Sequence, residues 1–108
     1  RDTTPVLLFI VNHPSRAHSG WEHAVQALQR FADEHSIKLY GVSSTSRIMS
    51  FAAQHQLQFP FLMADVTVLK TMARTDPCMV LLKQGVVKGK WSYLDIPDST
   101  QLSRLLNE

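Results

Sequence analysis

The sequence holds a single cysteine among its 108 residues, and this scarcity excludes a large group of functions. One thiol, Cys78, cannot form an intramolecular disulfide or a Cys-x-x-Cys redox pair. The 11 basic residues form no stripe and are nearly balanced by 9 acidic ones, so we expect no nucleic-acid binding. Long apolar runs are missing as well: the longest, Val6 to Val11, is too short for the domain itself to span a membrane.

The first half of the chain alternates short apolar runs with one strong amphipathic pattern. Val6 to Val11 predicts a strand that is covered on both faces, and Ile37 to Val42 predicts a second strand. Between them, Trp21 to His35 predicts a helix, because its apolar side chains share one face. We expect Trp21 and Trp91 to pack in the core or at the sheet edge rather than to serve recognition, with part of Trp21 open to exposure at the helix start. Core positions are expected at Phe9, Leu28, Phe31 and Leu81.

The second half shows start signals for three shorter helices. Arg47 to His55 predicts a helix that one of the preceding hydroxyl groups caps, and residues 58–62 predict a short strand. Asp65 is a good N-cap for a small third helix. Asp98, followed three residues later by Gln101, predicts a capping box at the start of the last helix.

Residues 75–91 predict a β-hairpin with its turn at Gln84-Gly85. Pro77 lacks the N–H needed inside a ladder and therefore lies at a strand start, and the Asp76–Pro77 bond is a plausible cis peptide. The resulting order is β-α-β-α-β-α-β-β-α. It predicts an α/β fold: one domain, residues 1–108, with a mixed central sheet flanked by helices and a C-terminal β-hairpin and helix.

Several segments resemble the thioredoxin-like superfamily, in the branch shared by peroxiredoxins and membrane-tethered thiol–disulfide proteins. Residues 40–44 resemble its second strand, residues 51–65 its helix and "FP" strand, Pro77 its cis-proline, and residues 82–87 its strand–turn–strand. The resemblance covers nearly the whole chain and implies a thioredoxin-like fold with Val6 to Val11 central in the sheet. The abrupt polar start at Arg1 is interpreted as the start of a domain cut from a longer chain, for which the resemblance suggests the periplasmic or cytoplasmic part of a bacterial membrane protein.

Active members of this superfamily open the first long helix with Cys-x-x-Cys. The thiolate is favoured there by the helix N–H groups and dipole. Counting back from the helix end at residues 31–35 places those positions on Ser19 and Glu22. A hydroxyl and a carboxylate thus replace both sulfurs, and the resemblance implies a domain without dithiol oxidoreductase activity.

The same resemblance implies a candidate binding cleft made of Ser19, Gly20, Trp21, Glu22, Asp76 and Pro77. Asp76 is either a polar group of this cleft or a loop residue in water. Cys78, directly after the proline, is either a reactive thiol or a small buried hydrophobe at a strand start.

Imidazole and carboxylate groups gather between residues 13 and 23: His13, His18, Glu22 and His23. These groups suit zinc, and His18 and Glu22 would share one face if the helix extended back to His18. Their spacing matches no established metal signature, so no metal or other cofactor is expected. An anion at the Ser19-Gly20 helix start, assisted by Arg16, is an alternative.

Three functions follow from the sequence. The first is a non-catalytic binding or accessory module whose partner is another protein or the remainder of a parent chain. The second is a single-thiol redox protein that uses Cys78, and the third is a metal or anion sensor at the loop from His13 to His23. Thiol reactivity distinguishes the second from the first, and titration with metals or anions distinguishes the third.

Overall fold

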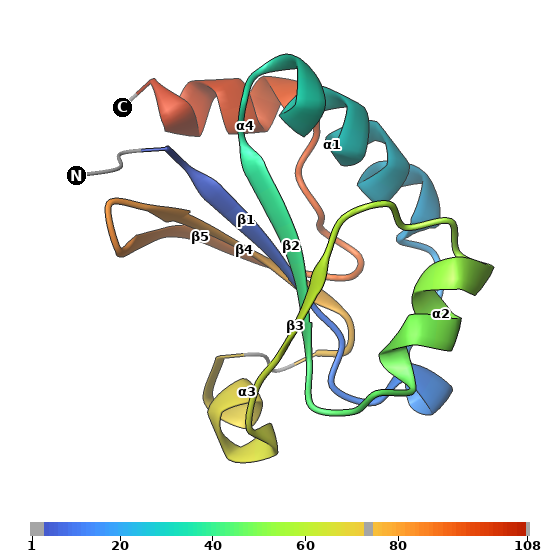
Figure 1. Ribbon diagram of the computed structural model, residues 1–108. Helices are drawn as coiled ribbons and strands as arrows, with labels where there is room; N and C mark the ends of the chain where they lie inside the picture. The colour runs from blue at the N-terminus through green and yellow to red at the C-terminus, as the bar shows by residue number, and fades with distance from the viewer. Residues whose placement is uncertain (1–3, 73–74, 108) are drawn as a thin grey trace.

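A computed structural model describes residues 4–72 and 75–107 and contains one five-stranded mixed sheet (Figure 1). The strand order is β3-β2-β1-β4-β5, so β1 is central, as predicted. β1 pairs in parallel with β2 and antiparallel with β4. The bounds are β1 Val6–Ile10, β2 Lys38–Ser43, β3 Phe61–Met63, β4 Cys78–Lys83 and β5 Val86–Ser92.

Within the described residues, four α-helices flank the sheet: α1 Glu22–Glu34, α2 Ile48–Gln54, α3 Val66–Met72 and α4 Ser99–Leu106. A short 3₁₀ turn, Pro14–Arg16, precedes α1. α1, α2 and α4 lie on one side of the sheet and α3 lies on the other (Figure 1). α1 and α2 share a side because each connects two parallel strands in the same sense, and such connections are right-handed.

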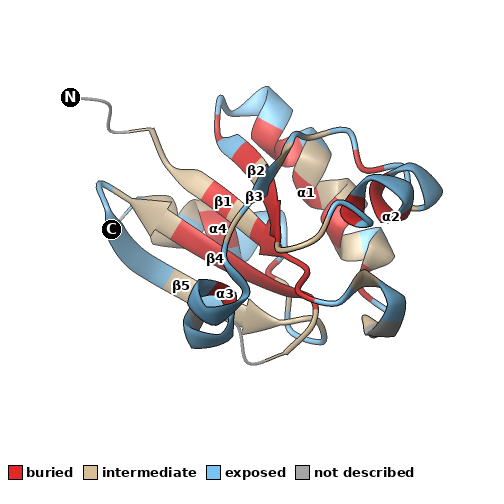
Figure 2. Ribbon diagram, turned by 60° about the horizontal axis from the view of Figure 1, so that its bottom comes forward, coloured by how far each residue is buried: buried red, intermediate tan, exposed pale blue. Residues whose placement is uncertain are grey.

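The main core lies between one face of the sheet and the helices α1, α2 and α4, which cover that face. Buried residues gather on the strands β1, β2 and β4 and on the face of α1 that packs on the sheet. The edge strands β3 and β5 are more exposed (Figure 2). The predicted core positions Phe9, Leu28, Phe31 and Leu81 are all buried. Burial of one leucine or phenylalanine side chain stabilises the fold by about 1.5–3 kcal/mol.

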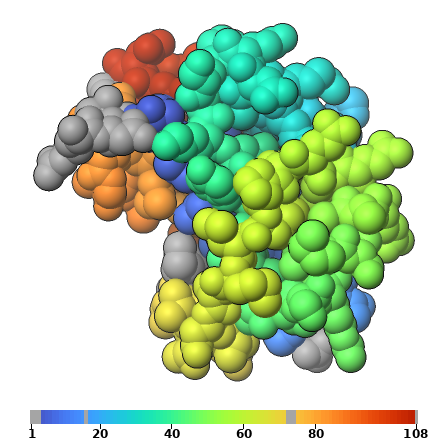
Figure 3. Space-filling model, in the orientation of Figure 1, coloured from blue at the N-terminus to red at the C-terminus, as the bar shows by residue number. Residues whose placement is uncertain are grey.

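A smaller apolar cluster lies on the opposite side of the sheet under α3. It consists of Ile10, Val42, Leu69, Cys78 and Val80. Cys78 belongs to it because its side chain leaves β4 toward this side. The segment from β3 to α3 crosses the front of the molecule in the view of Figure 3.

Local signals in the sequence account for most of the element boundaries. Asp98 and Gln101 form the predicted capping box of α4, and Asp65 accepts the amide of Thr67 at 2.7 Å before α3. Gln84 and Gly85 both have positive φ, as a tight hairpin turn between twisted strands requires. None of the described helices is long and apolar enough to cross a membrane.

Candidate functional site

The start of α1 and the loop before β4 lie side by side, as the resemblance implied. The amide of His18 donates to the carbonyl oxygen of Asp76 at 2.9 Å. The Asp76–Pro77 peptide is cis, as predicted. Gly20 has a φ of 103°, which turns the chain sharply into the helix at a place where a side chain would be strained.

The carboxylate of Asp76 points to the end of β1 and serves the backbone there. It accepts the amides of Asn12 at 2.6 Å and of His13 at 2.5 Å. The carboxylate of Asp76 is therefore engaged by the backbone after β1, and among the described residues it forms no hydrogen bond with Ser19 or Glu22. Its charge is compensated by two N–H donors, and its role in the fold is to tie the end of β1 to the proline loop.

Trp21 is core, as its place on the apolar face of the predicted helix indicated, and its position at the helix start leaves almost none of it exposed. Its side chain is 1% exposed and its ring lies 4.9 Å from that of Phe9 and 5.6 Å from that of Phe51. The indole N–H donates to the carbonyl of His18 at 2.7 Å, which satisfies the one polar atom of the ring. Burial is possible because Trp21 precedes the first turn of α1 and turns inward under the loop.

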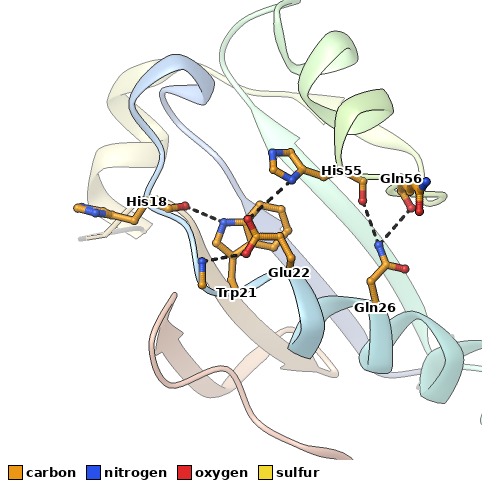
Figure 4. Close-up of polar contacts among 7 residues, drawn as sticks. His18, Trp21, Glu22, Gln26, His55 and Gln56 are labelled. Carbon is orange, nitrogen blue, oxygen red and sulfur yellow. Dashed lines mark hydrogen bonds and ion pairs between the residues drawn. The ribbon is translucent and has the colours of Figure 1, made fainter.

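Glu22 begins α1 and faces α2 instead of the proline loop. One carboxylate oxygen accepts the amide of Gly20 at 2.8 Å, and the other lies 3.8 Å from Nδ1 of His55 (Figure 4). A carboxylate at a helix start is stabilised by the helix dipole. Because it already takes the Gly20 amide, this amide is not free for an external anion. The side chain of Arg16, the expected helper, lies outside the described residues.

His55 and Gln26 extend these contacts into a small polar bridge between α1 and α2. The imidazole of His55 packs against the rings of Trp21 and Phe51, and Gln26 donates to the carbonyl oxygens of His55 and Gln56 (Figure 4). The helix start is thus occupied by contacts within the fold. Sequence reasoning missed this bridge, because nothing in a single sequence pairs Gln26 with residues thirty positions away.

The four candidate metal ligands do not converge. The ring of His18 stacks on Tyr93 at 4.5 Å, and it lies in a loop because α1 begins only at Glu22. His23 is exposed on α1, and the backbone of His13 is held by Asp76. Among the described residues, no three His, Cys, Asp or Glu side chains are grouped so that they could hold a metal ion.

Cys78 has the surroundings of a buried small hydrophobe. Its side chain is 2% exposed and packs in the cluster under α3. Burial raises the pKa of its thiol from 9.0 to about 11; the charge of Lys90 opposes this rise and that of Asp76 adds to it. At neutral pH the thiolate, which is the nucleophilic form, is therefore very scarce.

No protein-family model and no curated protein matches the chain, but solved structures do. The bacterioferritin comigratory protein of Xanthomonas campestris matches with a TM-score of 0.63 and 15% identity, over 97% of this chain and 80% of that one. A thiol:disulfide interchange protein of Chlorobium tepidum gives 0.62 and 13%, over 97% and 79%. StoA of Bacillus subtilis gives 0.60 and 19%, over 98% and 84%.

These likenesses establish the fold and nothing finer, since all three identities are below 20%. The chain has a thioredoxin-like fold with one cysteine and therefore no Cys-x-x-Cys. Fold does not fix function, so chemistry must be inferred from the residues at the site.

Proposed function

We propose that this chain is a non-catalytic thioredoxin-like domain that acts as a binding or accessory module of a larger protein. The state of Cys78 carries the proposal: the only thiol is buried, and its pKa is raised to about 11. A reversible dithiol cycle needs a second thiol to resolve the mixed disulfide. Ser19 and Glu22, which the resemblance assigns to the positions of the redox pair, supply none.

The helix start supports the same proposal, because its groups are engaged within the fold. Trp21 is buried, and Glu22 accepts the amide of Gly20 and faces His55. A redox helix start would instead need an exposed thiolate with free N–H donors around it. Here the corresponding groups stabilise the packing of α1 on the sheet and on α2.

A groove between α1 and the segment before and into α4 is the surface that we propose for binding. It has a volume of about 920 Å³. Apolar groups such as Ala24, Ala27 and Ile96 line it together with the polar side chains of His23 and Arg30. A concave surface that combines apolar groups with charged and hydrogen-bonding side chains can hold a peptide segment, and this lining also includes Glu34 and Asp98. The proposed partner is a protein segment, either from another protein or from the remainder of a parent chain.

The single-thiol redox protein is the alternative, and one observation favours it. Cys78 lines a hollow of about 370 Å³ together with Thr75, Lys90, Trp91 and Ser92. The charge of Lys90 lowers the pKa of the thiol, although burial outweighs it. Opening of this hollow would expose a thiol beside a cation.

Activity assays on the purified chain separate the two proposals. We expect no reduction of a protein disulfide and no turnover of hydrogen peroxide or an alkyl peroxide with a thiol reductant, beyond the rate without protein. The matched control is Cys78→Ser, which should give the same background. Turnover by the unsubstituted chain that is abolished in Cys78→Ser would overturn the proposal and favour the single-thiol enzyme.

A further inference from the structure

A small polar pocket lies where the neighbouring parallel strands β1 and β2 end. We name it the strand-end pocket; it is lined by Asn12, His13 and Ser15 after β1 and by Ser44, Thr45 and Arg47 after β2. Its volume is about 160 Å³, which is below the range of pockets for drug-sized ligands. It therefore has room for a small charged group and not for a large ring system.

Asn12 is a largely buried residue whose side-chain amino group has no partner among the described residues. The residue is 9% exposed, and its amide oxygen accepts the hydroxyl of Ser44 at 3.2 Å. Among the described residues, the amino group of the same side chain has no hydrogen-bond acceptor. Yet none of the buried side-chain nitrogen or oxygen atoms in the described part of the chain is both inaccessible and unpaired. The amino group therefore keeps some accessible surface, and the residue that carries it lines the pocket.

The charges around the pocket favour an anion. Arg47 is exposed at its rim, and within the described residues its guanidinium has no ion-pair or hydrogen-bond partner. No carboxylate is among the described residues that line the pocket. The nearby carboxylate of Asp76 is already compensated by the amides of Asn12 and His13. Three residues with side-chain donors, Asn12, Ser15 and Arg47, thus line the same small pocket.

We propose that the strand-end pocket binds the oxyanion group of a small molecule, a carboxylate or a phosphate. Arg47 would supply the charge and a planar pair of N–H donors, which match either group. Asn12 would donate from the pocket floor, and the hydroxyls of Ser15 and Thr45 would complete the contacts. The site uses neither Cys78 nor Glu22, so it is independent of whether the domain is redox-active.

The test is a titration of the chain with inorganic phosphate and, separately, with acetate, followed by amide NMR at moderate salt. We expect saturable shifts confined to residues 12–15 and 44–47 with at least one of the two probes, and the tighter probe identifies the preferred group. Arg47→Gln should weaken binding at least about tenfold, as removal of a charge-assisted contact does. The matched control Arg104→Gln removes the same charge on α4 and should change the affinity less than twofold.

Two results would overturn the proposal. One is the absence of saturable shifts at residues 12–15 and 44–47 with both probes. The other is equal weakening by Arg47→Gln and Arg104→Gln, since this would mean that the probes follow net charge only. Because Arg47 is exposed and makes no described side-chain contact, the variant is expected to fold, and its unchanged amide spectrum away from the pocket verifies this.

Discussion

The two ends of the loop that joins β1 to α1 are both polar, but their polar groups are used differently. At the α1 end, Trp21 and Glu22 direct their groups into the fold, toward His18 and His55. At the β1 end, Asn12 keeps a free amino group and lies beside the unpaired Arg47, within the described part of the chain. The α1 end is thus structural, whereas the donors without a described partner lie on Asn12, at the β1 end, and on Arg47, which follows the neighbouring strand β2.

Replacement of Trp21 tests whether the α1 end is part of the core. Trp21→Ala should lower the free energy of unfolding by about 3–5 kcal/mol, because it removes a buried aromatic side chain and leaves a cavity. Denaturant unfolding measures the loss. The control is Trp91→Ala on the edge strand β5, where the side chain is half-buried and the loss should be clearly smaller. Equal losses would show that the α1 end is no more integrated than the sheet edge.

The stability of the chain at high pH tests whether the Cys78 thiol is buried under α3, away from both ends of the loop. Burial raises the pKa of its thiol from 9.0 to about 11, so the native thiol stays protonated where the unfolded one ionises. This contribution to stability is complete below pH 9 and is lost between pH 9 and 11, by about 2–3 kcal/mol. The free energy of unfolding of the unsubstituted chain and of Cys78→Ala, measured from pH 9 to 11, gives the difference. In Cys78→Ala, the free energy of unfolding should fall less steeply with pH between pH 9 and 11. Equal pH dependence of the two proteins would contradict the assignment of Cys78 to the buried cluster under α3.

Asp76→Ala tests the link between the two ends. The carboxylate serves only the β1 end, through the amides of Asn12 and His13, while its backbone carbonyl holds His18. The variant should lose about 1–3 kcal/mol of unfolding free energy, since two donors lose a charged acceptor. Amide exchange should quicken at Asn12 and His13 and stay unchanged at His18. Asp33→Ala, at an exposed position of α1, is the control and should stay within about 0.5 kcal/mol. Faster exchange at His18 as well would show that the two ends are not separable.

Arg47→Gln should have the smallest effect on stability of these changes, within about 0.5 kcal/mol, because the side chain is exposed and makes no described contact. Thermal unfolding in buffer without phosphate measures it. A loss above 1 kcal/mol would mean that Arg47 has a structural role and is not held free for a ligand.

Much of the fold was predictable because its signals are local. The proline after Asp76, the Gln84-Gly85 turn and the capping box of Asp98 each fix the backbone within a few residues. The apolar spacing of α1 placed Leu28 and Phe31 in the core for the same reason. Such signals combine to give the element order, and the order restricts the topology strongly.

The site was less predictable, because side-chain direction depends on partners far along the chain. The resemblance placed Asp76 beside Glu22, but it could not show that Asp76 turns to Asn12, 64 residues away, while Glu22 turns to His55. The sequence alone assigned no function to Asn12 or Ser44. Their polar character after two neighbouring parallel strands was the available signal for a site at that sheet edge.

The most direct test of the central claim is the rate at which Cys78 reacts with a thiol reagent in the native chain at pH 7. A pKa raised by about two units lowers the thiolate fraction about 100-fold, and burial slows access further. The account therefore predicts native labelling at least about 100-fold slower than labelling in denaturant. If Cys78 were labelled as fast in the native chain as in denaturant, the thiol would be neither buried nor inert. This result would also contradict the proposed function as a non-catalytic binding module.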